Sequence, residues 1–232
     1  MNLVATISSK DTDETEQIRL ANSIANMREV LPALPAFYSA PSSSAASNFT
    51  ISYCATSALT PKQTLKLFEI FESNMKVHYE ATWGWNKNDR FKEIFDQASR
   101  FIIVSSNVAG GEDGADAIAG AASARDIDPA AIAGYCAYRF CWDDDDEPEH
   151  PVMYVYELQV HSAHQSLGIG RHLTEITVQI GRALRMWKVM LTCFKRNEQA
   201  MRFYMQSGFV IDANSPSAFG NTDEDYEILS HV

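Results

Sequence analysis

Apolar and polar residues alternate along this chain with two different periods, one typical of helices and one typical of strands. Repeats of three and four residues predict helices at 18–31, 61–79, 91–95, 173–184 and 197–204. Runs of β-branched and aromatic residues predict strands at 49–53, 101–104, 134–140, 153–160 and 189–194. Pro32 is expected to stop the first helix, and Leu65 is expected among the inward residues of the second.

Three segments interrupt this pattern. Residues 39–48 are rich in Ser and Ala and predict a low-complexity linker, which divides the chain into an N-terminal helical segment with linker at 1–48 and one domain at 49–232. The Ala/Gly-rich stretch 108–124 is expected to be a disordered insertion. The acidic run at 143–149 predicts an exposed turn, and it is equally a candidate for holding a cationic substrate.

The segment Gln165-Ser166-Leu167-Gly168-Ile169-Gly170-Arg171 stands between the strand at 153–160 and the helix that follows. Its glycines allow the backbone to approach a ligand closely, and the first amides of a helix have no acceptor of their own. This arrangement favours a pyrophosphate. The segment lacks the Gly-Lys-Ser/Thr ending of nucleoside triphosphatases, and Leu173 stands where a dinucleotide-binding loop has its third glycine. An ordinary loop without a ligand is the alternative.

A second element lies downstream, where Asn197 precedes Ala200 and Tyr204, and Gly208-Phe209 follow. The Gln-x-x-Gly-x-Gly loop and the Asn-x-x-Ala-x-x-x-Tyr-x-x-x-Gly-Phe helix together resemble the GCN5-related N-acetyltransferase superfamily over residues 100–213. The resemblance implies an α/β (α+β) fold with helices flanking a mixed central sheet, an N-terminal helical extension, and acetyl-coenzyme A as co-substrate. The implied co-substrate-binding residues are Leu158, Gln159, Val160, Ser166, Leu167, Gly168, Ile169, Gly170, Arg171 and Asn197.

Composition and charge narrow the class of protein further. The chain has 232 residues, of which 46% are hydrophobic, enough for a full core. Its four cysteines lack metal-type spacing, which indicates reduced core thiols, no metal site and an intracellular home. No apolar run approaches the length of a membrane span. The first residues lack the basic region and the long apolar region of a secretory signal, so neither membrane insertion nor secretion is expected. The net charge of −11 disfavours nucleic acid and favours a basic substrate.

Further motifs resemble one branch of the superfamily, the N-alpha-acetyltransferase D subfamily. They are Tyr154-Val155-Tyr156-Glu157-Leu158-Gln159, Lys188-Val189-Met190-Leu191-Thr192, the Trp83-Gly84-Trp85 turn, and Ser215-Pro216-Ser217 ahead of Tyr226-Glu227-Ile228-Leu229-Ser230. That subfamily acetylates the N-terminal amine of the Ser-Gly-Arg-Gly tails of histones four and two-A. The resemblance therefore implies basic protein tails as partners, the ribosome as a further candidate, and a cytoplasmic and nuclear location.

The same resemblance assigns residues to the substrate side. These are Tyr79, Trp83 or Trp85, Asp143, Tyr154, Tyr156, Thr192 and Tyr226. The Ala/Gly insertion at 108–124 and the long hairpin at 141–149 depart from the subfamily pattern, so the acidic residue of 143–149 that would hold substrate stays open.

Acyl transfer to an amine needs a group that takes the proton of the amine and one that protonates the leaving thiolate. Glu157 is the candidate base, directly or through a water, with Tyr154 and Tyr156 positioning the amine. Tyr204 is, by superfamily analogy, the candidate proton donor, and a plain core aromatic is the alternative. Strand alternation points Glu157 away from Tyr154 and Tyr156 unless a local bulge re-aims it.

Three functions are compatible with these residues. An N-terminal acetyltransferase accounts for both the acidic clusters and a glutamate beside two tyrosines. A lysine or other protein acetyltransferase of the same fold is the main alternative, although a lysine with a pKa near 10.4 demands a stronger base than an N-terminal amine near 8. A catalytically inactive acetyl-coenzyme A-binding module explains neither feature.

Overall fold

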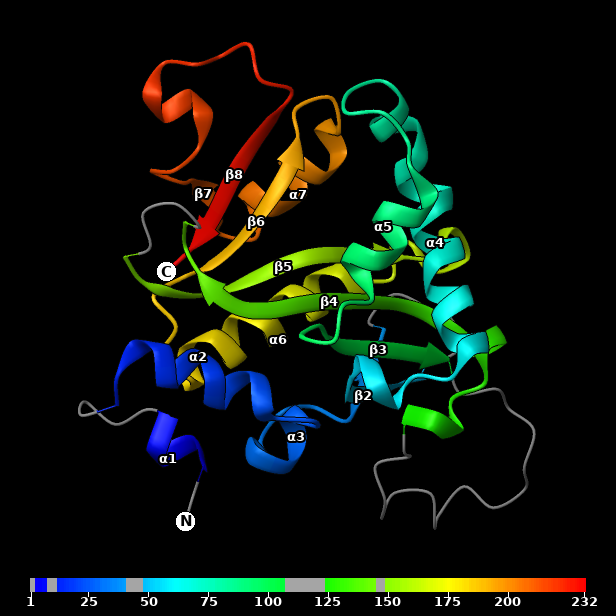
Figure 1. The fold of residues 1–232 in the computed structure, drawn as a ribbon. Coiled ribbons are helices and arrows are strands. Elements are labelled where there is room, and N and C mark those ends of the chain that lie inside the picture. Colours follow the sequence, from blue (N-terminus) through cyan, green and yellow to red (C-terminus); the bar gives the residue numbers. More distant parts are fainter. Residues whose placement is uncertain (1–2, 8–11, 41–47, 107–123, 145–148) are drawn as a thin grey trace.

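A computed structural model describes residues 3–7, 12–40, 48–106, 124–144 and 149–232. Within these ranges one eight-stranded sheet forms the centre of the molecule, in the order β1-β2-β3-β4-β5-β6-β8-β7 (Figure 1). The strands are β1 (Phe37–Ser39), β2 (Asn48–Ala55), β3 (Arg100–Ser106), β4 (Ile132–Trp142), β5 (Pro151–Val160), β6 (Val189–Phe194), β7 (Val210–Ile211) and β8 (Tyr226–His231). Neighbouring strands are antiparallel except β5 and β6, which are parallel. The sheet is therefore mixed, as expected.

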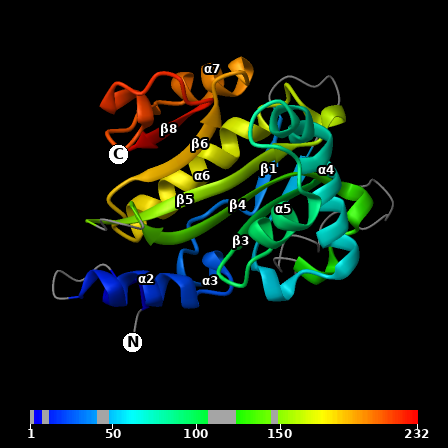
Figure 2. The same cartoon turned by 45° about the horizontal axis from the view of Figure 1, so that its top comes forward.

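Helices cover both faces of this sheet. They are α1 (Leu3–Ile7), α2 (Glu14–Ser23), α3 (Met27–Val30), α4 (Pro61–Glu80), α5 (Lys87–Ile94), α6 (Ile169–Ala183) and α7 (Glu198–Gln206). Apolar residues of α2, α3, α6 and α7 share one core cluster with the sheet, and those of α4 and α5 share a second. Figure 2 shows α6 lying along the strands. The two clusters lie on opposite faces, because β4 contributes Cys136 and Tyr138 to the first and Tyr135 and Ala137 to the second.

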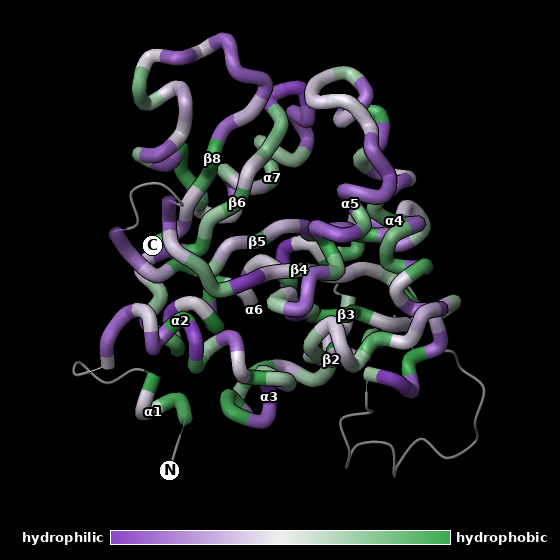
Figure 3. Tube along the Cα trace, viewed as in Figure 1, coloured by the Kyte–Doolittle hydropathy of each residue, from purple (hydrophilic) through white to green (hydrophobic). Residues whose placement is uncertain are grey.

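The predicted strands and most of the predicted helices are confirmed, with longer bounds. Helix α4 starts at the expected Thr60-Pro61 step, where Thr60 and Gln63 form a capping box. Figure 3 shows apolar and polar residues alternating along α4, as expected for a helix with one face on a sheet. The prediction for Leu65 is wrong, because its side chain is 59% exposed. Leu65 precedes the buried Leu67 by two positions, which places it about 200° around the helix.

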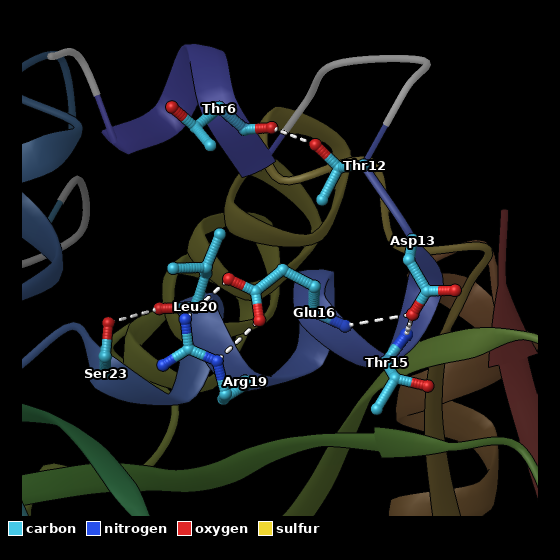
Figure 4. Close-up of polar contacts among 8 residues, drawn as sticks. All are labelled: Thr6, Thr12, Asp13, Thr15, Glu16, Arg19, Leu20 and Ser23. Atoms are coloured by element: carbon cyan, nitrogen blue, oxygen red, sulfur yellow. Dashed lines mark hydrogen bonds and ion pairs between the residues drawn. The ribbon is translucent and has the colours of Figure 1, made fainter.

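The single predicted helix at 18–31 is two helices, α2 and α3. The side chain of Asp13 accepts hydrogen bonds from the amides of Thr15 and Glu16 and so caps α2 (Figure 4). Where α2 ends, the buried guanidinium of Arg100 donates hydrogen bonds to the carbonyl oxygens of Asn22 and Ile24. These carbonyls turn toward Arg100 and do not continue the helical ladder. The apolar residues up to Pro32 keep their helical spacing, but the helix is interrupted between α2 and α3. The carbonyl oxygens there bind the buried cation of Arg100.

Strands β1, β7 and β8 were not predicted, and β1 and β7 are too short to show an alternating pattern. Strand β1 pairs with β2 through Tyr38 and Phe49, which joins the N-terminal segment to the sheet. Most of the expected linker (41–47), nearly all of the expected insertion (108–123) and part of the acidic hairpin (145–148) lie outside the described residues. None of the described helices has the length and apolar character that a membrane span requires.

Candidate active site

A cleft opens where β5 and β6 separate. The two strands pair only from Met153 to Val155 on β5, opposite Val189 to Leu191 on β6. Beyond this point Figure 1 shows them running apart. The cleft between them has a volume of about 1420 Å³ and is lined by parts of α4, α5, β4, β5, β6, α7 and the segment before α6. Residues 156–160 of β5 form one wall, with backbone groups that have no partner strand on that side.

A β-bulge at Tyr156 determines which side chains of β5 face the cleft. On β4, Ala137 lies opposite Glu157 while Tyr138 lies opposite Val155, so Tyr156 is an additional residue on β5. The alternation of side chains shifts by one position there. As a result, Glu157 faces the same side of the sheet as Tyr156, against α4 and α5. The re-aiming that the hypothesis about Glu157 required is confirmed.

The carboxyl group of Glu157 is held in a dry environment. Its residue is only 8% exposed, and the side-chain amide of Gln159 donates to Oε2 at 2.7 Å. Burial raises the pKa of Glu157 to about 8, an effect that the Gln159 hydrogen bond and Arg90 oppose and Glu93 reinforces. A carboxyl group with this pKa gains and loses its proton close to neutral pH. It therefore has the property expected of an acid–base group.

Two tyrosines flank Glu157 on the same face. The hydroxyl groups of Tyr154 and Thr192 are hydrogen-bonded at 2.6 Å, which links β5 to β6 near the point where their pairing ends. The rings of Tyr154 and Tyr156 are in contact, with centroids 5.0 Å apart. Both tyrosines and Thr192, which the resemblance assigns to the substrate side, line the cleft.

Arg139 fixes one of these rings from behind. Its guanidinium carbon lies 3.9 Å from the ring centroid of Tyr156, and its Nε donates to the hydroxyl of Ser99 at 2.9 Å. A further N–H of Arg139 donates to the carbonyl of Glu93 at the end of α5. This stacking was not predicted, since Arg139 lies on the neighbouring strand and no local pattern distinguishes it.

The loop before α6 has the geometry of an anion cradle. Ser166 and Gly168 both have positive φ, at 64° and 83°, and the first helical hydrogen bond runs from the amide of His172 to the carbonyl of Gly168. Within the described part of the chain, no hydrogen bond is recorded for the backbone amides of 166–171. Free amides at a helix N-terminus fit a phosphate group.

The side chains of this loop play unequal roles. Ser166, Gly168, Ile169, Gly170 and Arg171 line the cleft. The side chain of Leu167 packs instead against the core beneath, so only its backbone belongs to the loop surface. A methyl group on Gly170 would lie 3.5 Å from the ring of Phe203, an ordinary contact.

Helix α7 supplies the opposite wall. Its N-cap is Asn197, whose Oδ1 accepts from the amide of Ala200 at 3.2 Å. Tyr204 is buried where it lines the cleft, and burial raises its pKa well above the ordinary value. Its hydroxyl therefore keeps its proton throughout the neutral range and is available as a donor. Leu158, Gln159 and Val160 complete this end of the cleft from β5.

The expected substrate-side residues divide into two groups. Tyr79, Trp83 and Asp143 line the cleft, and Trp83 remains 49% exposed at its mouth. Trp85 and Tyr226 do not line it. Trp85 packs into the α4–α5 core, because its ring contacts Phe68, Phe71 and Tyr79. Tyr226 lies behind Trp83, with ring centroids 5.2 Å apart, and so supports it from β8.

Three further acidic residues are among those that line the cleft. Asp143 and Asp144 come from the end of β4, and Glu93 comes from α5. Oδ1 of Asp143 accepts from the amides of Glu149 and His150 at 3.0 and 2.9 Å, so one of its oxygens shapes the hairpin. The sequence reading missed Glu93, which is paired with Arg90 at 2.6 Å, and also missed Asn74 and His78 on α4. Their only sequence signal was a polar helix face, and packing of α4 and α5 brings that face to the cleft.

Comparisons with known proteins agree with this geometry. Residues 64–209 match the model of the acetyltransferase (GNAT) family. N-alpha-acetyltransferase 40 of Saccharomyces cerevisiae is 39% identical over 74 residues, which cover 29% of this chain and 26% of that protein. The chain thus spans about a quarter of the length of this curated relative.

Solved structures share the fold. An acetyltransferase from Streptococcus agalactiae superposes with a TM-score of 0.50 at 13% identity, covering 79% of this chain and 98% of that one. Arabidopsis thaliana Naa50 in complex with a bisubstrate analogue is also similar, with a TM-score of 0.48, 15% identity, and 78% and 98% of the two chains covered. With most of its length matching the family model, the chain belongs to the acetyltransferase (GNAT) family.

Proposed function

We propose that this protein is an N-alpha-acetyltransferase that moves the acetyl group of acetyl-coenzyme A to the N-terminal amine of Ser-Gly-Arg-Gly-type tails, such as those of histones four and two-A. The observation that carries the proposal is the buried carboxyl of Glu157 with its pKa near 8, set between tyrosines in the cleft. The identity to a yeast N-alpha-acetyltransferase supports it. A histone substrate would be met in the cytoplasm or the nucleus, and on the ribosome if the tail is acetylated during synthesis.

The residues present fit the co-substrate. The free amides of 166–171 would hold its pyrophosphate, the backbone of Leu158–Val160, which has no partner strand on the cleft side, would pair with its pantetheine arm, and Asn197 would contact it from α7. When bound, acetyl-coenzyme A supplies an acetyl group activated as a thioester. The protein then has to orient the amine and move two protons.

The pKa of Glu157 favours an N-terminal amine over a lysine. An α-amine has a pKa of about 8, so passing its proton to a carboxylate with a pKa of about 8 costs little. The same transfer from a lysine near 10.4 would be uphill by about 3 kcal/mol. Glu157 would take the proton directly or through one water, and Tyr204 would donate a proton to the departing thiolate.

The proposal is tested by finding which amine of a peptide substrate carries the acetyl group after the reaction. Four peptides should be compared by mass spectrometry: a free Ser-Gly-Arg-Gly tail, the same tail with a blocked α-amine, one with Leu at the second position, and an unrelated acidic peptide. We expect acetylation of the first alone, on the hypothesis that the large rings of Trp83 and the tyrosines, which line the cleft, exclude a side chain larger than Gly at the second position. Acetylation of lysines in the blocked tail would replace the proposal by a lysine acetyltransferase, and equal use of all free peptides would replace it by a general enzyme.

A second test concerns the arginine of the tail. Glu93, Asp143 and Asp144 line the cleft of a chain whose net charge is −11, so a guanidinium in the substrate should be held by carboxylates. Replacing the peptide arginine by Gln should lower kcat/KM about tenfold or more, as for loss of a charge-assisted hydrogen bond. The difference should shrink in 0.5 M salt. Equal kcat/KM for both peptides at low salt would contradict acidic recognition of the tail.

A further inference from the structure

Tyr38 on β1 reaches the loop that precedes α6. Its hydroxyl donates a hydrogen bond to the carbonyl oxygen of Leu167 at 2.7 Å. Its ring stacks on that of His172 in the first turn of α6, with centroids 4.6 Å apart and planes at 24°. Figure 2 shows β1 close to α6 at this edge of the sheet. The N-terminal segment therefore makes direct contact with the anion cradle, although it lies outside the 64–209 family match.

The hydrogen bond fixes the orientation of one peptide group in the cradle. In a trans peptide the carbonyl of one residue and the amide of the next point in opposite directions. Because the carbonyl of Leu167 points toward Tyr38, the amide of Gly168 points away from it. Gly168 lines the cleft and Tyr38 does not, so this orientation aims the amide at the cleft.

The same tyrosine sets the space at Gly168. A methyl group on Gly168 would lie 2.3 Å from the hydroxyl oxygen of Tyr38, and the next atom it would meet is the Cζ of Tyr38 at 3.5 Å. The φ of +83° independently favours glycine here. Two causes therefore exclude a side chain at 168, and removal of the Tyr38 hydroxyl relieves one of them.

We propose that Tyr38 is a positioning residue for acetyl-coenzyme A, which holds the 166–171 loop so that its amides meet the pyrophosphate. The inference rests on the proposed role of this loop as the pyrophosphate site. Burial raises the pKa of Tyr38, so its hydroxyl stays a donor across the working pH range. Phe49 on β2 contacts the turn just before this loop, as its ring meets that of His164 edge-on with centroids 5.9 Å apart.

The test compares Tyr38→Phe with Tyr53→Phe. Tyr53 is the matched control, because its hydroxyl donates at 2.8 Å to the carbonyl of Pro35 in the same N-terminal segment without touching the loop. Loss of one hydrogen bond should raise both the KM for acetyl-coenzyme A and the calorimetric Kd for coenzyme A about 3- to 10-fold in Tyr38→Phe. We expect kcat at saturation to stay unchanged, and Tyr53→Phe to bind coenzyme A like wild type. Equal Kd values for the two variants would overturn the inference.

Gly168→Ala separates this inference from the loop assignment itself. In the wild-type background it should weaken coenzyme A binding about tenfold or more, and in the Tyr38→Phe background the added loss should be smaller, because the 2.3 Å contact is gone. Strictly additive losses would overturn a contact between Tyr38 and the loop. A folded Gly168→Ala protein with unchanged coenzyme A affinity would overturn the proposed pyrophosphate site, whatever Tyr38 does.

Discussion

Replacing Glu157 by Gln should lower kcat for a free N-terminal amine by at least about tenfold, because general bases contribute about 10² to 10⁴. The glutamine side chain has the same shape and still reaches Gln159. Its amide, unlike a carboxylate, does not take up a proton at the pH of the assay. The measurement is steady-state acetylation of a Ser-Gly-Arg-Gly peptide between pH 6 and 9. The acid limb of the wild-type profile should combine the ionisation of Glu157, with its pKa of about 8, and that of the peptide amine, and the variant should keep only the second.

Glu93→Gln is the matched control for this experiment. Glu93 lines the same cleft but is paired with Arg90 at 2.6 Å and lies at the half-exposed end. Its loss should affect the KM of the peptide and change kcat less than about fivefold. If Glu157→Gln matches wild type in both rate and pH profile, Glu157 is a structural carboxyl and another group takes the proton.

The large-scale fold follows from local patterns in the sequence. Alternating runs at 134–140 and 153–160 and the helical stripe from Leu173 to Leu184 predict the central strands and α6 because their periods differ clearly. The loop at 165–171 and the helix that begins near Asn197 resemble those of a known family, and this resemblance predicts how the elements are arranged. Capping residues such as Thr60 and Asn197 predict helix starts, since their interactions lie within four residues.

Features that depend on distant residues were not predictable. The end of α2 is set by Arg100, more than seventy positions away in the sequence, so apolar spacing alone suggested one helix. Arg139 and Glu93 enter the site from neighbouring elements. The resemblance of the Trp-Gly-Trp turn placed Trp83 or Trp85 near substrate, and only packing decides that the ring of Trp83 faces the cleft and that of Trp85 the core.

The bulge at Tyr156 was predictable in part. A glutamate that follows a tyrosine in a strand should face the opposite side, and the functional hypothesis for Glu157 required a local irregularity. The register of β4 and β5 contains that irregularity. The requirement for the bulge was predictable from the chemistry, and its position was not, because neither Gly nor Pro marks it in Tyr154–Glu157.

The buried carboxyl of Glu157 should also make the protein less stable as pH rises. Burial raises its pKa from an ordinary 4.5 to about 8, so between these values the folded state binds a proton that the unfolded state has lost. The resulting stabilisation is fully present below pH 4.5 and is lost as pH rises through 8. A shift of this size corresponds to at most about 5 kcal/mol in the free energy of unfolding.

Glu157→Gln removes this ionisation, so its free energy of unfolding should exceed that of wild type increasingly from pH 6 to pH 9. Urea unfolding at each pH measures the difference. Asp212→Asn is the control with the opposite sign. Burial raises the pKa of Asp212, but hydrogen bonds from Ser230, the Asn214 amide and Lys188 outweigh it and lower that pKa, so its contribution changes only in acid. A Glu157→Gln difference that stays constant from pH 6 to pH 9 would show that the carboxyl titrates in its ordinary range, and an N-terminal amine would then have no matched base in the cleft.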